Sequence, residues 1–383
     1  MEERIQIFKP WFEQDEYEAL REPLRTGWLG TGPKVHEFEI RFAEYVGVKH
    51  AVALNSATAA LHLAMLVTGV EGREVLTTSM TFVSSNHAIR YADGYPVFCD
   101  IEEDTLNLDA GKIEAKISEQ ARAILVVHYG GHACDMDPII EIARKFDLAV
   151  IEDVAQACGG SYRGRKLGGI GDIGCFSFES KKNLSTGDGG MLTTNDDIVA
   201  ERVRRLKWMG ISRGTWERFH GLKPGRSWEY DVTEFGFKYQ MNDIAGSLGL
   251  VQLGKLDQGN AMRRKLLDRY REAFAQLDGV ELLAQRDYAG NACYSAVIQL
   301  NERDALCDFL AARGIESGVH FYPSHLYSIY QPYNSAPLPV TEAVWERILT
   351  LPLYPQLTEE QQNRVIAAVK SFSADRREVA QRA

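Results

Sequence analysis

The sequence predicts an α/β protein, with a mostly parallel seven-stranded sheet in a large domain (residues 1–250) and a smaller α+β C-terminal domain (251–383). Short apolar segments alternate with helical segments between about residues 50 and 200. Such alternation is typical of a wound α/β fold. Beyond about residue 250, the pattern changes to a long, charged helix followed by short strands. A chain of 383 residues is long enough for two domains and a large buried core.

Seven segments rich in Val, Ile, Leu or Phe are expected to form the sheet. Most do not alternate between apolar and polar residues, which is typical of strands buried on both faces of a parallel sheet. The segments are Ala51–Leu54, Glu74–Thr78, Pro96–Asp100, Ala123–His128, Ala149–Asp153, Ile173–Phe178 and Gly190–Thr194.

Helices are expected between several of these strands, for example at Pro138–Phe146. Thr58–Val67 has the clearest helical pattern. Ser56 or Thr58 can cap its start, and Gly69 can end it.

The C-terminal region is expected to begin with a long helix and to end with another. The predicted elements are helix Val251–Leu277, strands Tyr294–Leu300 and Gly318–Tyr322, helix Thr358–Phe372 and a mobile tail, Ser373–Ala383. Gly210–Glu229 is rich in Gly, Arg and Trp and is predicted to be a functional or disordered loop.

Composition narrows the classes of function. The formal net charge of −10 argues against nucleic acid or an anionic membrane as the main partner, although a local basic pocket can still bind an anionic substrate. The N-terminus lacks an apolar signal core, and no segment approaches the roughly 18 apolar residues of a membrane span. The six cysteines lack close metal-binding spacing and are expected to be buried thiols. We therefore expect a soluble cytoplasmic protein without a metal site.

The segment Val150–Ala157 places polar groups where an apolar strand ends. Asp153 is the last residue of the expected strand, and Gln156 follows three residues later. Ligands of open α/β sheets bind at the carboxyl ends of strands. The alternative is that Asp153 only caps a helix.

Two further segments have the chemistry of a cofactor site. Phe176–Met191 contains Lys181 and Lys182 in a serine-rich turn before several glycines, and a lysine beside a buried strand end is a candidate Schiff-base nucleophile. The alternative is a solvated surface lysine. Asn55–His62 leads from a strand into a helix, whose first amides suit a phosphate. The alternative there is ordinary helix capping.

Taken together, the three segments indicate pyridoxal 5′-phosphate (PLP). This cofactor needs a lysine, a carboxylate beside its ring nitrogen, a phosphate site and a group that covers its ring. Phe82, which follows the expected strand Glu74–Thr78, can cover the ring; the alternative is a core aromatic residue.

The sequence resembles the nucleotide-sugar aminotransferases of the DegT/DnrJ/EryC/StrS family, which have the fold of aspartate aminotransferase (fold type I). The resemblance covers residues 5–372, so that the larger domain is expected to be the PLP-binding domain. The matching motifs are Gly27–Val35, Asn55–His62, Glu152–Ala157, Cys175–Met191, Gly236–Asp243 and His320–Leu326.

The resemblance implies roles for the residues that bind the cofactor. Lys182 matches the Schiff-base lysine, and Asp153 matches the carboxylate that pairs with the pyridine nitrogen. Gln156 matches the amide that hydrogen-bonds the 3-oxygen of the cofactor. Ser177 matches the hydroxyl that binds the phosphate.

Three further residues of the resemblance complete the cofactor site. Ala57 and Thr58 match the helix-start amides on the phosphate, and Phe82 matches the aromatic residue that stacks on the ring.

This chain departs from the family pattern at several positions. Lys181 stands where the family usually has a small residue, and Glu179 replaces a common His or Tyr. In the family, a partner subunit completes the phosphate site, often with an asparagine. The corresponding segment here carries Lys238 and Gln240 instead.

The resemblance further implies a homodimer with shared sites, and transfer of an amino group from L-glutamate to a nucleotide-linked keto-deoxysugar. The candidate substrate contacts are Trp28, Lys34, Arg213, His320, Tyr322 and His325. Two alternatives remain open. One is a PLP-dependent sugar dehydratase, in which a histidine replaces the lysine. The other is a non-catalytic sensor with the PLP fold.

Overall fold

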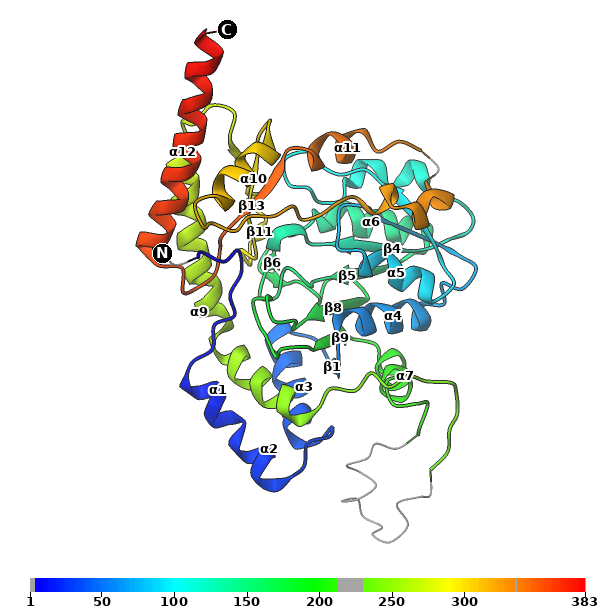
Figure 1. Ribbon diagram of the computed structural model, residues 1–383. Helices are drawn as coiled ribbons and strands as arrows, with labels where there is room; N and C mark the ends of the chain where they lie inside the picture. Colours follow the sequence, from blue (N-terminus) through cyan, green and yellow to red (C-terminus); the bar gives the residue numbers. More distant parts are fainter. Residues whose placement is uncertain (1–3, 213–229, 335, 383) are drawn as a thin grey trace.

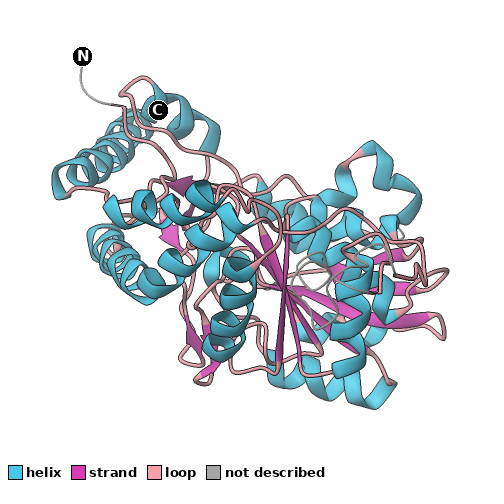
Figure 2. Ribbon diagram, turned by 90° about the horizontal axis from the view of Figure 1, so that it is seen from below, coloured by secondary structure: helices cyan, strands magenta, loops and turns pink. Residues whose placement is uncertain are grey.

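The structure is a computed structural model that describes residues 4–212, 230–334 and 336–382. A twisted sheet crosses the larger part of the molecule and carries helices on both faces (Figures 1 and 2). The sheet has seven strands in the order β1-β9-β8-β5-β4-β2-β3. The α/β prediction with a mostly parallel seven-stranded sheet is therefore confirmed.

All seven expected strands are present, with ends that differ by no more than two residues from the prediction. Only β9 runs against the others, because it pairs antiparallel with both β1 and β8. The strands are β1 (His50–Leu54), β2 (Glu74–Thr78), β3 (Tyr95–Cys99), β4 (Ala121–Val127), β5 (Ala149–Asp153), β8 (Ile173–Ser177) and β9 (Gly190–Thr194).

Helices cover the two faces of the sheet because successive strand residues are apolar on both sides. In β1, Ala53 faces the cluster formed with α3 (Pro33–Val46) and α6 (Met136–Phe146). Its neighbour Val52 faces the opposite cluster. That cluster includes α4 (Ala57–Thr68), α5 (Ser84–Tyr91) and α7 (Asp197–Leu206).

Helix α4 begins and ends as the sequence indicates. The Ser56 hydroxyl accepts a hydrogen bond from the Ala59 amide at 3.1 Å. Gly69 ends the helix with a left-handed φ of 73°. The Ser56 cap satisfies the Ala59 amide, so the amides of Ala57 and Thr58 remain directed out of the helix start.

The long helix α9 (Asp243–Phe274) links one hydrophobic cluster of the large sheet to the C-terminal cluster. It begins eight residues before the expected Val251, because Asn242 caps it by accepting a hydrogen bond from Ala245 N. Leu256 belongs to the cluster of the large sheet, whereas Leu267 belongs to the C-terminal cluster. The domain division at residues 250/251 stays a prediction, because α9 runs through that position without a break.

A small antiparallel sheet organises the C-terminal region, in the order β10-β12-β13. The predicted strand Tyr294–Leu300 is present as β12 (Ala296–Gln299). The predicted strand Gly318–Tyr322 is wrong, since only Gly318 forms a bridge, to Thr350. Beyond Gly318 the His320 carbonyl accepts a hydrogen bond from the Tyr129 hydroxyl. That bond turns the segment toward the large sheet, while β13 (Ile348–Leu351) takes the place beside β12.

Residues from near both ends of the described chain also pack in this region. Ile5 forms a bridge with Ile315 and lies in the C-terminal cluster. The last helix, expected to end at Phe372, continues to Arg382 as α12 (Glu359–Arg382).

The remaining elements are short. They are α1 (Gln14–Ala19), α2 (Arg21–Thr26), α10 (Arg303–Ala311), α11 (Pro339–Trp345), β6 (Ser161–Tyr162), β7 (Arg165–Lys166), β10 (Glu281–Leu282), β11 (Ala289–Gly290), η1 (Ala110–Lys112), η2 (Glu114–Lys116), η3 (Tyr129–Gly131), η4 (Ser324–Leu326) and η5 (Ser328–Tyr333). No described helix is both long and apolar enough to cross a bilayer. All six cysteines are free thiols, and five of them are buried. Most of the predicted loop Gly210–Glu229 lies outside the described residues.

Candidate active site

The candidate cofactor-binding residues of the large sheet lie along one of its edges. Strands β1, β8, β5, β4 and β2 all point the same way, so their carboxyl ends share this edge. Along it lie, in order, the start of α4, then Ser177, then Asp153, then the turn after β4, and finally the segment around Phe82. This edge is where open α/β sheets bind ligands.

The first part of the edge is a cradle built around Gly190. The register pairs Gly190 with Ser177 on one side and with Leu54 on the other. A Cβ atom on Gly190 would lie 2.4 Å from the Ser56 carbonyl carbon and oxygen and 2.7 Å from Ala57 N. Glycine therefore lets the start of α4 approach the Ser177 hydroxyl, which is largely buried at 6% exposure. Helix-start amides beside a hydroxyl are well suited to a phosphate.

Asp153 is a buried carboxylate at the end of β5, the strand next to β8. Its Oδ2 accepts a hydrogen bond from Ser85 Oγ at 2.7 Å, and its Oδ1 accepts one from Ala155 N at 3.0 Å. Burial raises the pKa of the Asp153 carboxyl, although these hydrogen bonds and the positive charges of Lys182 and His128 act against the rise. A cationic ring nitrogen beside the carboxylate would offset the same desolvation.

Gln156 and Phe82 flank Asp153. Gln156 Oε1 accepts a hydrogen bond from Gly130 N at 2.9 Å, which joins the segment after β5 to the turn after β4. The Phe82 ring is 57% exposed and lies 5.9 Å from the Phe321 ring centroid. Ser85, the hydroxyl partner of Asp153, is only three residues from Phe82, and its backbone amide donates to the Phe82 carbonyl at 3.2 Å. Phe82 is therefore an exposed aromatic ring near the buried carboxylate rather than a core residue.

Lys182 lies in the turn between β8 and β9. The turn is closed by the Lys182 amide, which donates to the Glu179 carbonyl at 2.9 Å. The next residue, Asn183, donates from Nδ2 to Asn260 Oδ1 and to the Ala292 carbonyl, both at 2.8 Å. These bonds fix the turn against α9 and against the segment that leads to β12.

The Lys182 side chain meets an aromatic group that the sequence did not single out. Its Nζ lies 3.5 Å from the Tyr294 hydroxyl oxygen and 4.6 Å from the Tyr294 ring centroid. The Tyr294 ring stacks on Phe8, and Phe8 in turn contacts the ring of His320 edge-on.

His320 is the predicted substrate contact that the structure brings to this group. Its Nδ1 lies 2.9 Å from Thr350 Oγ1. Burial lowers the pKa of His320 to about 4, and the positive charges of Lys182 and Lys181 add to the effect. His320 is therefore neutral at physiological pH and can act only as a neutral hydrogen-bonding group.

The other predicted substrate contacts lie elsewhere or are otherwise engaged. Trp28 donates from Nε1 to the Thr31 carbonyl, and Lys34 forms an ion pair with Glu22 at 2.6 Å. Tyr322 is half-exposed and lies against Tyr327 and Trp345. His325 is fully buried, with one ring nitrogen on Ser79 Oγ and the other on Glu342 Oε1. The structure therefore leaves neither nitrogen of His325 for a ligand. Arg213 lies outside the described residues.

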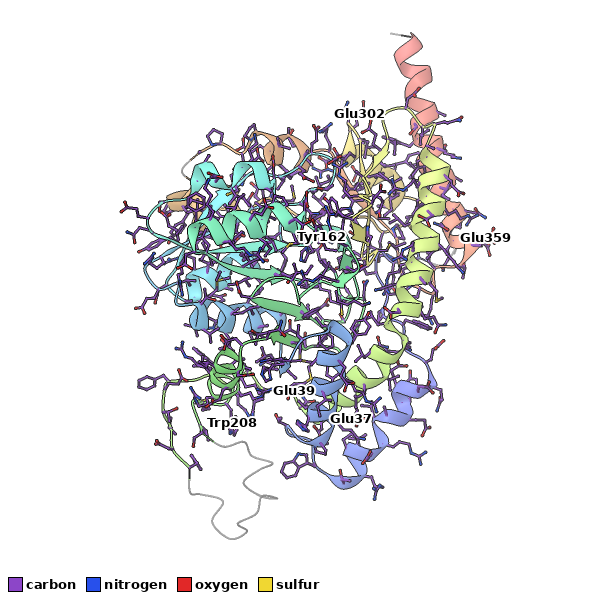
Figure 3. The ribbon with its side chains drawn as sticks, turned by 180° about the vertical axis from the view of Figure 1, so that it is seen from behind. Glu37, Glu39, Tyr162, Trp208, Glu302 and Glu359 are labelled. Carbon is purple, nitrogen blue, oxygen red and sulfur yellow. The ribbon has the colours of Figure 1, made fainter. Side chains whose placement is uncertain are left out.

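Lys238 and Gln240 lie beside the start of α4. Lys238 Nζ donates to Gln240 Oε1 at 2.8 Å and lies 3.8 Å from the ring centroid of Trp208, which Figure 3 labels at the end of α7. The backbone carbonyl of Lys238 accepts a hydrogen bond from Asn55 Nδ2 at 3.3 Å. The segment 236–243 thus borders the phosphate cradle of its own subunit.

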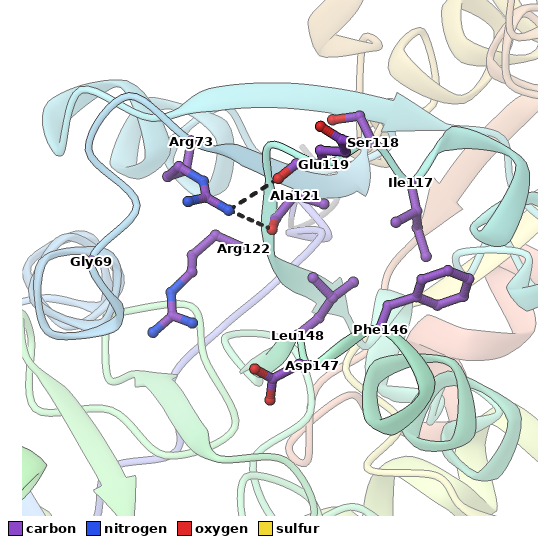
Figure 4. Close-up of a pocket in the computed structure, with 10 residues that line it drawn as sticks. All are labelled: Gly69, Arg73, Ile117, Ser118, Glu119, Ala121, Arg122, Phe146, Asp147 and Leu148. Carbon is purple, nitrogen blue, oxygen red and sulfur yellow. Dashed lines mark hydrogen bonds between the residues drawn. The ribbon is translucent and has the colours of Figure 1, made fainter.

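A recess of about 560 Å³ lies at the opposite edge of the sheet (Figure 4). It surrounds the amino ends of β2, β4 and β5, and Arg73 Nη2 donates there to the Glu119 and Ala121 carbonyls. Arg122 Nε donates to the Thr68 carbonyl at the end of α4. These arginines satisfy backbone carbonyls, so the recess is not the candidate site.

The residues at the carboxyl edge fit PLP. Gly190 opens a cradle that a Cβ atom would fill, Asp153 is a buried carboxylate suited to a cationic ring nitrogen, and Lys182 supplies a primary amine. No group of three or more metal-ligating side chains occurs among residues 4–212, 230–334 and 336–382.

Sequence reasoning missed Ser85, Tyr294 and Phe8. Ser85 belongs to an ordinary helix start, and Tyr294 and Phe8 lie in short segments without a motif. Their roles depend on contacts between distant parts of the chain, such as the Phe8–Tyr294 stack, and no local pattern carries that information.

Comparisons with known proteins agree with this geometry. A family model described as the DegT/DnrJ/EryC1/StrS aminotransferase family matches residues 10–370. GDP-perosamine synthase of Caulobacter vibrioides is 38% identical over 374 residues, which is 96% of this chain and 97% of that protein.

Two solved structures have nearly the same fold. The aminotransferase TlmJ of Streptoalloteichus hindustanus has a TM-score of 0.91 at 34% identity and covers 97% of this chain and 99% of its own. The PLP form of Spr1654 of Streptococcus pneumoniae, a protein described as a sugar aminotransferase, has a TM-score of 0.88 at 30% identity. It covers 97% of this chain and 99% of its own.

Proposed function

Because the chain belongs to the DegT/DnrJ/EryC1/StrS aminotransferase family, we propose that it moves the amino group of L-glutamate onto a nucleotide-linked keto-deoxysugar, with PLP held on Lys182. The chain is an enzyme of the sugar-aminotransferase class, whose members depend on PLP. The donor, the nucleotide and the sugar are the parts that we propose. The name of GDP-perosamine synthase supports a nucleotide-linked sugar as the acceptor.

One observation carries the proposal: Lys182, buried Asp153 and the Gly190 cradle lie along a single edge of the sheet. The Ser177 hydroxyl and the amides of Ala57 and Thr58 would hold the phosphate. Asp153 would hold the ring nitrogen in its protonated form, and Gln156 the ring oxygen. Phe82 would cover the face of the ring and exclude water from it.

When bound, the cofactor supplies an electron-withdrawing ring that draws electrons away from a substrate Cα–H bond. Lys182 Nζ would take the proton from Cα of glutamate and deliver it to the cofactor carbon to which Lys182 Nζ itself had been bonded. In the second half of the cycle, Lys182 moves a proton in the reverse direction for the sugar. The negative charge of Asp153 keeps the ring nitrogen protonated throughout.

The chemistry of Lys182 also supports aminotransfer over the two alternatives. A dehydratase of this fold would carry a histidine at this position, so the lysine favours aminotransfer. A non-catalytic sensor would have no need for a reactive amine together with a carboxylate, an amide and a hydroxyl set around one cradle.

The proposal includes assembly as a homodimer in the cytoplasm. Lys238 is exposed and Gln240 is partly exposed, so a second copy of the chain can approach the segment that carries them. In this assembly each subunit contributes Lys238 or Gln240 to the phosphate of its partner.

The experiment is a half-reaction. Purified protein loaded with PLP is mixed with L-glutamate alone, and the absorbance of the bound cofactor is followed. We expect conversion to the spectrum of the amine form with release of 2-oxoglutarate. If none of the twenty common amino acids produces this change, the aminotransferase proposal is wrong and the dehydratase or sensor gains support. Keto-deoxysugars linked to different nucleotides, added to the amine form, then identify the acceptor by regenerating the first spectrum.

A further inference from the structure

Tyr294 contacts the reactive lysine from a part of the chain more than a hundred residues away. Its hydroxyl oxygen lies 3.5 Å from Lys182 Nζ, and its ring centroid lies 4.6 Å from the same atom. We propose that Tyr294 is a positioning residue that holds the Lys182 amine whenever that amine is not bonded to the cofactor. The catalytic part of this inference rests on the proposed aminotransferase function.

The two contacts are complementary. An ammonium group over an aromatic ring within about 6 Å of its centroid is attracted to the ring electrons. The Tyr294 hydroxyl accepts a hydrogen bond from the same nitrogen at the ring edge. Tyr294 is only 5% exposed, so water competes weakly for either contact.

Tyr294 is itself held rigidly. Its ring stacks on Phe8 with a centroid distance of 4.9 Å and an interplanar angle of 14°. Its amide donates to the Gly130 carbonyl at 3.1 Å, and the Gly130 amide in turn donates to Gln156. The Ala292 carbonyl, two residues earlier, accepts from Asn183. The segment 291–295 is therefore fixed between the turn that carries Lys182 and the turn that binds Gln156.

A reactive lysine needs such a holder. The side chain of a lysine has four rotatable bonds, and confining it costs conformational entropy. During aminotransfer the amine leaves the cofactor, moves a proton and returns to the same carbon. A fixed aromatic face next to the cofactor keeps the amine within reach and oriented during these steps. The neighbouring His320 is neutral, so it does not repel the ammonium.

The first test needs no cofactor. Lysine side chains of the cofactor-free protein are labelled with a low concentration of an amine-reactive acetylating reagent, and labelling of Lys182 is measured relative to Lys181 in the same peptide. Tyr294→Leu should raise this ratio about 3- to 10-fold, because the amine loses the ring that shields it. A ratio equal to that of the wild type in a folded Tyr294→Leu protein would overturn the proposal.

The second test separates positioning from folding. Tyr294→Phe keeps the ring and its stack on Phe8 but removes the hydroxyl. We expect the half-reaction with L-glutamate to slow about 3- to 10-fold, with PLP affinity nearly unchanged. The deuterium isotope effect with α-deuterated glutamate should increase, because proton transfer by a less well oriented amine becomes more rate-limiting.

A matched control is Tyr270→Phe, which removes another buried hydroxyl. The Tyr270 hydroxyl donates to the Pro352 carbonyl at 3.0 Å, and within the described part of the chain no hydrogen bond joins it to Lys182. This variant should lose stability without a change in the isotope effect. An isotope effect in Tyr294→Phe that equals the wild-type value would contradict the proposal. If the wild type itself gives no half-reaction while the labelling ratio rises, the hold on Lys182 stands and the proposed aminotransfer fails.

Discussion

Replacement of Gly190 by alanine tests the phosphate cradle directly. The added Cβ atom would lie 2.4 Å from the Ser56 carbonyl carbon and oxygen and 2.7 Å from Ala57 N. Ordinary contact begins near 3.4 Å, so one side must move by about 1 Å (3.4 − 2.4 Å). Strand β9 is paired on both sides, and the start of α4 is therefore the part that gives way.

The expected magnitude follows from the hydrogen bonds at the helix start. A displacement of this size stretches an amide–phosphate hydrogen bond beyond its useful range. Each hydrogen bond to a charged group contributes about 1.5–3 kcal/mol. Loss of one such bond weakens PLP binding by about 10- to 150-fold. Pyridoxal, which lacks the phosphate, should bind Gly190→Ala and the wild type with similar affinity.

Gly174→Ala serves as the matched control. Its Cβ atom would lie 2.4 Å from Thr193 Oγ1 and 2.5 Å from the Gly168 backbone, an equal clash in the same sheet. Both variants should lose about 1–3 kcal/mol of unfolding free energy. Only Gly190→Ala should bind PLP more weakly, as measured by titration of folded, cofactor-free protein. Wild-type affinity in Gly190→Ala, or an equal loss in Gly174→Ala, would refute the cradle.

Three further predictions concern charge and assembly. In cofactor-free protein, burial raises the pKa of Asp153 above its ordinary 3.8. The protein should therefore lose stability as the pH rises from about 3.8 through the pKa that Asp153 has in the folded state. Asp153→Asn should therefore unfold no more easily than the wild type at pH 7 by chemical denaturation, yet turn over at least about 100-fold more slowly. For His320, whose pKa falls to about 4, stability should decrease as pH falls from 6.5 to 4, and His320→Gln should flatten that part of the curve. Mixed dimers of Lys182→Ala with the double variant Lys238→Ala/Gln240→Ala should recover one working site, measured as activity after subunit exchange.

Each of these predictions has a contradicting outcome. Wild-type turnover in Asp153→Asn would show that another group holds the ring nitrogen. If the stability of His320→Gln depends on pH as that of the wild type does, groups other than His320 cause the loss of stability at acidic pH. For the dimer, the double variant must first bind PLP weakly by itself. Failure of the mixture to regain activity, or an active species that sediments as a monomer, would then reject the shared site.

The sequence predicted the large sheet well because its strands are buried on both faces. A continuous apolar segment such as Ala123–Val127 is typical of a strand that is buried on both faces of a parallel sheet. The same burial brings Asp153 and Ser177 to one edge, which is why their proximity follows from strand direction alone.

The C-terminal region was predicted less well because contacts between distant segments shape it. Gly318–Tyr322 looks like a strand, but the hydrogen bond between Tyr129 and the His320 carbonyl takes it out of the sheet. Tyr294 reaches Lys182 only because the segment before β12 is bonded to Gly130. His325 is the opposite case. It lies in a segment that matches the family, but both of its ring nitrogens are hydrogen-bonded within the protein.

The role of Lys182 is tested most directly by finding which lysine holds the cofactor. Borohydride reduction of the PLP-loaded protein, followed by proteolysis and mass spectrometry, fixes the cofactor to its lysine. We expect the label on Lys182, its loss in Lys182→Ala, and retention of both label and most activity in Lys181→Ala. A label on Lys181, or no label on either residue of the loaded protein, would contradict it.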